Sequence, residues 1–60
     1  MDKLRKFREE IGMSQEELAK KTGVSRVTIS MLETGNKKNI TVNTLLKLAK
    51  ALHKNITDFF

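Results

Sequence analysis

The chain has 60 residues, of which 12 are Lys or Arg and 7 are Asp or Glu, giving a net charge of +5, with no Cys and a single His. This length predicts one domain over residues 1–60, and the lack of Cys excludes disulfide scaffolds, thiolate metal sites and cysteine nucleophiles. No apolar run is long enough to span a bilayer, and the start MDKLRKFREE lacks the apolar segment of a secretory signal, so we expect a cytoplasmic protein.

Charge is unevenly distributed along the chain. Residues 1–23 contain six Lys or Arg against five Asp or Glu, whereas residues 24–54 contain six against Glu33 alone. The second half is therefore the candidate region for an anionic partner such as nucleic acid. A solvated basic face is the alternative explanation, and the position of these charges on the fold has to decide between the two.

Apolar residues recur at helical spacing, which predicts an all-helical fold. Asp2 is a candidate cap for a first helix, which presents Leu4, Phe7 and Ile11 on one face and ends at Gly12.

The second predicted helix begins with a capping box at residues 14–17, SQEE, in which the first and last residues each bond the other's backbone amide. This helix directs Leu18 and Ala19 inward. It ends at Thr22 and Gly23, because Gly adopts the left-handed conformation of a helix terminus without steric cost.

Ser25 is the predicted cap of a third helix, which extends to Glu33 or Thr34 and precedes Gly35 and a polar loop at residues 36–39. The next cap, Thr41, opens a fourth helix that we predict to be the central element of the core. Its apolar residues are Val42, Leu45, Leu46, Leu48, Ala49 and Leu52.

A last cap is predicted at Asn55, with Asp58 three residues later. It opens a short terminal helix that supplies Ile56, Phe59 and Phe60 to the interior. The whole chain is thus predicted to form five short helices.

The third helix has apolar residues on two opposite sides. At about 100° per residue, Ile29 and Leu32 share one side, while Val27, Ser30 and Met31 lie roughly opposite. A domain this small cannot bury both sides, so we place Ile29 and Leu32 in the core and Val27 and Met31 at the surface.

An exposed apolar pair on a capped helix suits the major groove of DNA. Arg26 and Thr28 flank Val27 and Met31. Arg reads guanine, and side chains with methyl groups contact the thymine methyl. The alternative is that Val27 and Met31 are covered by another protein.

The stretch LRKFREEIGMSQEELAKKTGVSRVTISMLETG closely resembles the XRE-type helix-turn-helix family, the class of phage repressors and Cro proteins. The resemblance covers almost the whole chain. Ala19 matches the small residue at the helix crossing, Gly23 the turn glycine, and Ile29 and Leu32 the core positions. It implies a lambda-repressor-like DNA-binding domain with the helix-turn-helix formed by the second and third helices, encoded by a bacterium or a phage.

The resemblance also implies which residues contact double-stranded DNA. The base-reading positions are Arg26, Val27, Thr28, Ser30 and Met31. The backbone-contacting positions are Gln15, Ser25, Thr34, Lys37 and Lys38. Arg8 and Glu33 match a family pair that ties the first helix to the end of the third, so we assign them a structural role. His53 stands where the family often has Gly, and we predict a strained or solvated cap there.

Two further functions are weighed against DNA binding. An enzyme has little support, because the sequence has no paired carboxylates, metal-spaced ligands or phosphate-binding Gly loop; we therefore expect no catalytic residue, metal or cofactor. A protein-interaction module, such as the antitoxin of a toxin-antitoxin pair, would use Val27 and Met31.

A membrane-surface peptide is disfavoured by the core-like fourth helix, so we expect no membrane partner. We predict a transcriptional regulator, most simply a repressor, that binds a palindromic operator as a homodimer. Phe59 and Phe60 are expected to contribute to the contact between its two copies.

Overall fold

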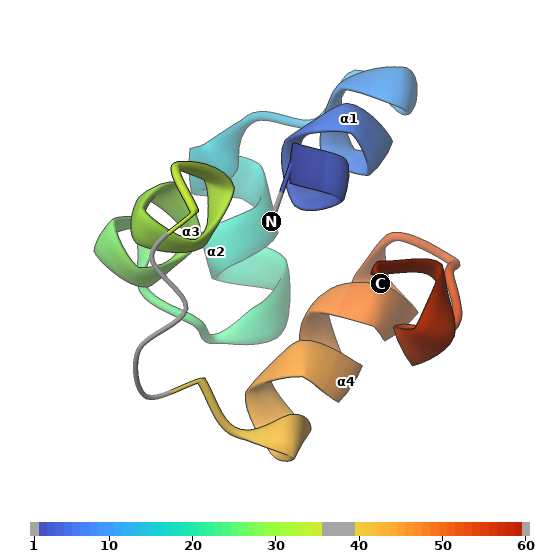
Figure 1. Ribbon diagram of the computed structural model, residues 1–60. Coiled ribbons are helices and arrows are strands. Elements are labelled where there is room, and N and C mark those ends of the chain that lie inside the picture. The colour runs from blue at the N-terminus through green and yellow to red at the C-terminus, as the bar shows by residue number, and fades with distance from the viewer. Residues whose placement is uncertain (1, 36–39, 60) are drawn as a thin grey trace.

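The computed structural model describes residues 2–35 and 40–59, and these residues form helices without any strand (Figure 1). The helices are α1 (Asp2–Glu10), α2 (Gln15–Thr22), α3 (Arg26–Glu33), α4 (Val42–Ala51) and the short 3-10 helix η1 (Ile56–Phe59). The predicted all-helical fold is confirmed, and the fifth helix is a single 3-10 turn. No helix in these two ranges has the length and apolar character needed to cross a membrane.

Side-chain caps set the start of each of the three middle helices. The Ser14 hydroxyl accepts a hydrogen bond from the Glu17 amide at 3.0 Å, and the Glu17 carboxylate accepts one from the Ser14 amide at 2.9 Å. Ser25 and Thr41 cap α3 and α4 with one such bond each: their hydroxyls accept hydrogen bonds from the Thr28 and Thr44 amides. At the end of α2, Gly23 has a φ of 77°, and its amide bonds the Ala19 carbonyl at 2.9 Å. These predicted boundaries are confirmed.

The core lies where the helices meet. α2 contacts both α3 and α4, while α1 contacts α3 and η1. The buried apolar residues are Leu4, Leu18, Ile29, Leu32, Leu45, Leu48, Ala49, Ala51, Leu52 and Phe59. Every described helix contributes at least one of these buried residues, so each helix packs into the common core.

Three apolar residues expected to face the core lie at the surface, and Val42, at the start of α4, is 67% exposed. Ile11 is exposed, because α1 ends at Glu10 and the chain turns at Gly12, which has a φ of 66°. Leu46 is 46% exposed, because it lies about 100° around α4 from the buried Leu45. The expectation that these three residues help form the core is therefore wrong.

The C-terminal turn is anchored to the first helix. The Asn55 amide donates to the Asp58 carboxylate at 2.8 Å, and the Asp58 amide donates to the Asn55 backbone carbonyl at 2.9 Å, so Asp58 rather than the Asn55 side chain closes this turn. The Phe59 ring meets the Phe7 ring edge to face, with centroids 5.2 Å apart. Phe59 is therefore a core residue of one copy of the chain and is not available for a contact between copies, while Phe60 lies outside the described residues.

His53 has the left-handed backbone expected at a strained helix terminus. Its φ is 58°, and its side chain is exposed. A non-Gly residue adopts this conformation at an energetic cost. This observation matches the predicted cap.

Candidate nucleic-acid interface

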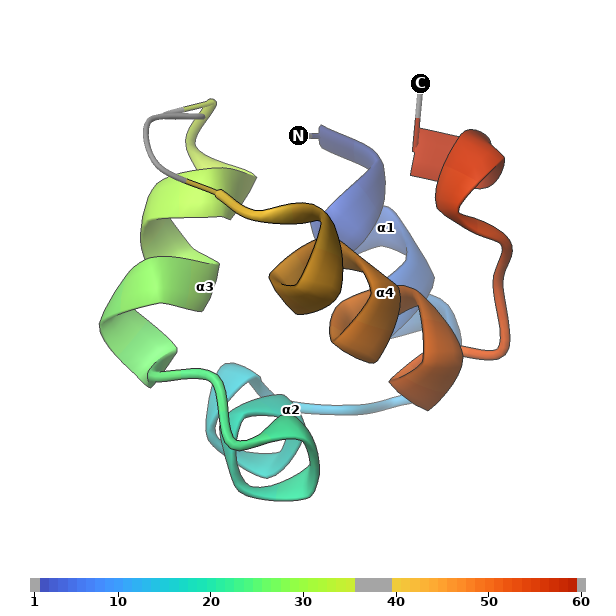
Figure 2. The ribbon, with the colours of Figure 1, turned by 90° about the horizontal axis from the view of Figure 1, so that it is seen from below.

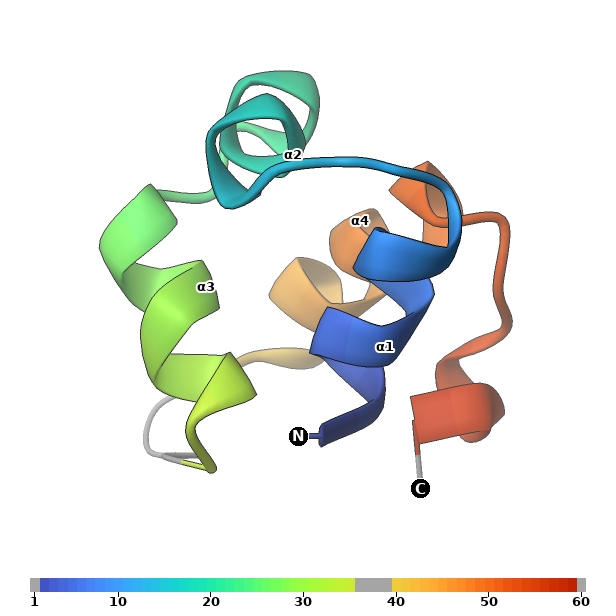
Figure 3. The same ribbon diagram turned by 90° about the horizontal axis from the view of Figure 1, so that it is seen from above.

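α2 and α3 are joined by a turn of three residues, Gly23–Ser25, and form the predicted helix-turn-helix. α3 lies at one side of the molecule, and η1 lies at the opposite side, in views from below and from above (Figures 2 and 3). The outer face of α3 is therefore open to a large partner, while its inner face rests on the core.

The two faces of α3 differ sharply in exposure. Ile29 and Leu32 are almost completely buried, whereas Val27 is 65% exposed and Met31 is 42% exposed. Arg26 is also exposed, at the start of the helix. Three of the five predicted base-reading residues thus share an accessible surface.

The other two predicted base-reading residues, Thr28 and Ser30, are half-buried. The Thr28 hydroxyl accepts a hydrogen bond from the Ser25 hydroxyl at 2.8 Å, and the Thr28 amide donates to the same Ser25 oxygen at 3.1 Å. These bonds fix the first turn of α3 and place the Thr28 hydroxyl beside the cap. No acidic residue lies in this first turn, so the positive end of the helix dipole is uncompensated there.

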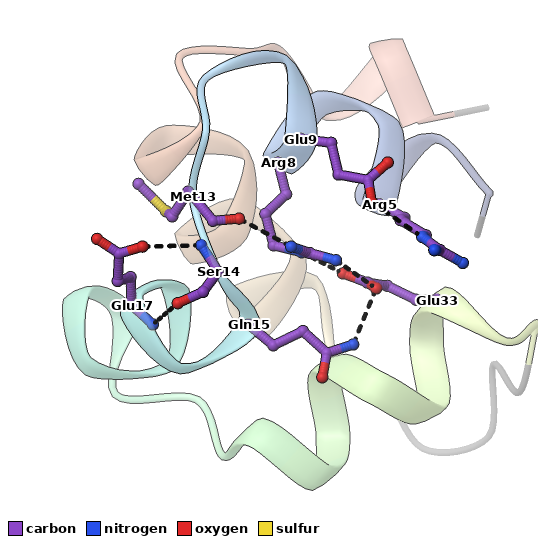
Figure 4. Close-up of polar contacts among 8 residues, drawn as sticks. All are labelled: Arg5, Arg8, Glu9, Met13, Ser14, Gln15, Glu17 and Glu33. Atoms are coloured by element: carbon purple, nitrogen blue, oxygen red, sulfur yellow. Dashed lines mark hydrogen bonds and ion pairs between the residues drawn. The ribbon is translucent and has the colours of Figure 1, made fainter.

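A buried ion pair connects α1 to the end of α3 (Figure 4). The Arg8 Nε and Nη2 atoms donate to the two Glu33 carboxylate oxygens at 2.7 and 3.0 Å. The third arm of the guanidinium, Nη1, donates to the Met13 carbonyl at 2.8 Å. Such a bidentate contact fixes both the distance and the orientation of the two helices.

Gln15 belongs to the same network, because its Nε2 donates to Glu33 Oε1 at 3.0 Å. The start of α2 is thereby held against the end of α3, which defines the angle of the helix-turn-helix. Sequence reasoning missed this bond, because no local pattern links two residues 18 positions apart. The assignment of Gln15 to a phosphate stays a prediction.

The electrostatics of the pair favour its ionised form. Burial of Glu33 opposes ionisation, but hydrogen bonds from Arg8 and Gln15 and the nearby charges of Arg8 and Arg5 outweigh it, so the Glu33 pKa lies below its usual range. The hydrogen bond to Glu33 is the main cause that raises the pKa of Arg8. Both side chains are thus charged at neutral pH.

The remaining predicted backbone contacts lie around the two ends of α3. Ser25 and Thr34 are exposed, and the Thr34 hydroxyl donates to the Met31 carbonyl at 3.0 Å. Lys37 and Lys38 lie outside the described residues. Within residues 2–35 and 40–59, no three His, Cys, Asp or Glu side chains are grouped so that they could hold a metal ion.

Comparisons with known proteins give matches that cover almost the whole chain. A family model described as helix-turn-helix matches residues 4–59. Two uncharacterised HTH-type transcriptional regulators of Archaeoglobus fulgidus are 47% and 41% identical to this chain over 58 residues each. Each alignment covers 97% of this chain and 81% or 80% of the relative. No solved structure gave a significant match.

Proposed function

This chain belongs to the helix-turn-helix family, and we propose that it is a transcriptional regulator that binds double-stranded DNA with α3 in the major groove. The observation that carries the proposal is the outer face of α3, where Val27 and Met31 remain exposed beside Arg26. Exposed apolar side chains at this density on a short helix suggest a surface that is covered when the protein works.

Each exposed residue has a distinct proposed role. Arg26 donates a pair of hydrogen bonds to a guanine, and Val27 and Met31 contact thymine methyl groups. Ser25 and Thr34 contact phosphates on either side, and the uncompensated N-terminus of α3 attracts the DNA backbone. The Arg8–Glu33 pair keeps α3 at a fixed angle on the core, so that these contacts are made together.

The proposed role is regulatory rather than catalytic. A protein that covers an operator blocks other proteins from that DNA, so repression is the simplest outcome. We propose that the protein acts in the cytoplasm, because the sequence start MDKLRKFREE lacks the apolar segment of a secretory signal.

Arg26→Ala is expected to separate sequence reading from charge attraction. On the preferred duplex the variant should lose about 1 to 3 kcal/mol of binding free energy per half-site, with much less loss on a scrambled duplex. The preferred duplex is obtained by selection from random sequences, and both duplexes are titrated over a salt series.

Lys6→Ala is the matched control, because Lys6 is an exposed cation on α1 that takes no part in the α3 surface. It should weaken both duplexes slightly and equally. Equal losses on both duplexes for Arg26→Ala would exclude the base-reading role.

The regulator is expected to occupy its operator as a homodimer. The described part of the chain measures 26 × 22 × 19 Å, which is less than the spacing of about 34 to 36 Å between major grooves on one side of DNA. Two copies related by a two-fold axis reach two such grooves, so the selected operator should be palindromic. Sedimentation of the complex and operators with altered half-site spacing test this, and full affinity for one half-site by one copy would contradict it.

A further inference from the structure

α4 carries a second exposed apolar surface, which the proposed DNA contact does not use. Val42 is 67% exposed and Leu46, one turn later, is 46% exposed. Leu46, Ala49 and Ile56 also line a groove of about 440 Å³ between α4 and η1, which we call the α4 groove. η1, which borders this groove, lies on the side of the molecule opposite α3 (Figure 2).

The surroundings of the α4 groove are basic. Lys50 and Lys54 line it, and Lys50 also borders a neighbouring hollow of about 380 Å³ together with Lys21 and Lys47. No acidic residue lines either hollow among the described residues, and α4 itself contains none. None of the ion pairs found in the described ranges involves these four lysines.

One of these lysines is held in place by the core. The Lys54 ammonium lies 4.6 Å from the centre of the Phe7 ring, a cation–π contact that positions the charge at the end of the groove. Lys50 is exposed on the ridge between the two hollows. The groove thus combines apolar side chains with two positive charges, and Asn55 and Thr57 complete its lining.

We propose that the α4 groove binds an acidic amphipathic helix of another protein. The apolar side chains of this partner helix would enter the groove beside Leu46, and its carboxylates would pair with Lys50 and Lys54. This is the recognition mode in which an amphipathic helix lies in a groove.

Three other possible occupants of the α4 groove fit it less well than an acidic helix does. A second copy placed symmetrically on this surface would bring the same lysines toward each other, and like charges repel. DNA offers phosphates for the lysines but no apolar side chain for the groove. An anionic membrane offers both, yet a flat surface does not fill a concave groove.

The test uses the whole chain and a designed helix of about 18 residues, with Leu at i, i+3, i+4 and i+7 and Glu on both flanks. Of two matched control peptides, one has Lys in place of every Glu and the other has Ser in place of every Leu. We expect the first peptide to bind in fluorescence anisotropy at least about tenfold more tightly than either matched peptide. Amide NMR shifts should map to α4 and η1 and leave α3 unchanged.

Protein variants locate the site. Leu46→Ala and Lys50→Glu should each weaken binding of the acidic peptide by about tenfold or more, because they remove the apolar contact or reverse the paired charge. Lys20→Glu is the matched control, since Lys20 is exposed on α2 and lines neither hollow. DNA binding, measured in parallel, should be the same in Lys50→Glu and Lys20→Glu.

Peptide binding by the α4 groove is measured without DNA, so a negative result there leaves the proposed DNA binding unaffected. No preference for the acidic peptide, NMR shifts on α3, or equal effects of Lys50→Glu and Lys20→Glu would each overturn it. Stronger binding to phosphatidylserine vesicles than to the peptide would assign the surface to a membrane. Dimerisation that Leu46→Ala abolishes would assign it to a second copy.

Discussion

Arg8→Ala is expected to lower the free energy of unfolding by about 3 to 5 kcal/mol, because it leaves the Glu33 carboxylate buried without its partner. The two side chains are 10% and 4% exposed, so the intact pair is largely shielded from water, and the Gln15 bond is the one side-chain contact to Glu33 described above that Arg8→Ala leaves in place. A domain of this size is stable by only roughly 3 to 9 kcal/mol, so much of the population should unfold. Urea unfolding followed by circular dichroism at neutral pH measures the loss.

The exposed Arg5–Glu9 pair provides the matched control on the same helix. Its N–O distance is 3.2 Å, and Arg5→Ala should cost no more than about 0.5 kcal/mol. The double variant Arg8→Met with Glu33→Leu should be less destabilised than Arg8→Ala, because it removes both charges. Similar losses in the free energy of unfolding for Arg8→Ala and Arg5→Ala would show that the buried pair contributes no more to stability than the exposed pair.

The same pair should make stability depend on pH on the acid side. Because the Glu33 pKa is lowered in the folded state, its contribution is complete above its unfolded pKa of about 4.3 and is lost as pH falls through the folded pKa. The Glu17 pKa is also lowered, mainly by the Ser14 amide, and acts in the same window. Glu33→Gln should flatten the acid side of the stability profile, while the contribution of Glu17 remains.

Local rules explain how much of the fold the sequence predicts. The starts at Ser14, Ser25 and Thr41 and the end at Gly23 depend on residues within four positions of one another, so a short window contains all the necessary information. The same holds for the two faces of α3, because helical periodicity separates Ile29 from Val27 whatever else the chain does.

Long-range packing explains what the sequence does not predict. Leu46 is apolar and helical like Leu45, and only the positions of α1, α2 and η1 decide which of the two is covered. Phe59 is apolar at a chain end, and its burial depends on the Phe7 ring 52 positions earlier. The Gln15 bond to Glu33 likewise exists only once α2 and α3 are in place.

In the candidate site, too, the exposure of the residues could be predicted from local sequence, whereas their roles could not. Exposure of Val27, Met31 and Arg26 could be predicted from the periodicity of one helix. Their assignment to bases and phosphates came from the resemblance to a family, and it stays a prediction until DNA is bound.

Leu32 links α3 to the core, so its truncation tests the inward face of this helix directly. Leu32 is 2% exposed and lies within the same buried cluster as Leu18, Leu48 and Ile29. A methyl group in place of its side chain leaves a cavity that the surrounding helices cannot fill without losing their own contacts. The cost therefore includes both lost burial and the cavity.

Leu32→Ala is expected to lower the free energy of unfolding by about 2 to 5 kcal/mol, measured by thermal and urea unfolding. Leu46→Ala is the same chemical change on an exposed position of α4 and should alter stability by no more than about 0.5 kcal/mol. Because periodicity alone treats both leucines as core residues, the difference between the two variants isolates the effect of packing. Coincident melts of Leu32→Ala and the parent chain would show that α3 does not rest on the core through this face, and the outward orientation of Val27 and Met31 would fall with it.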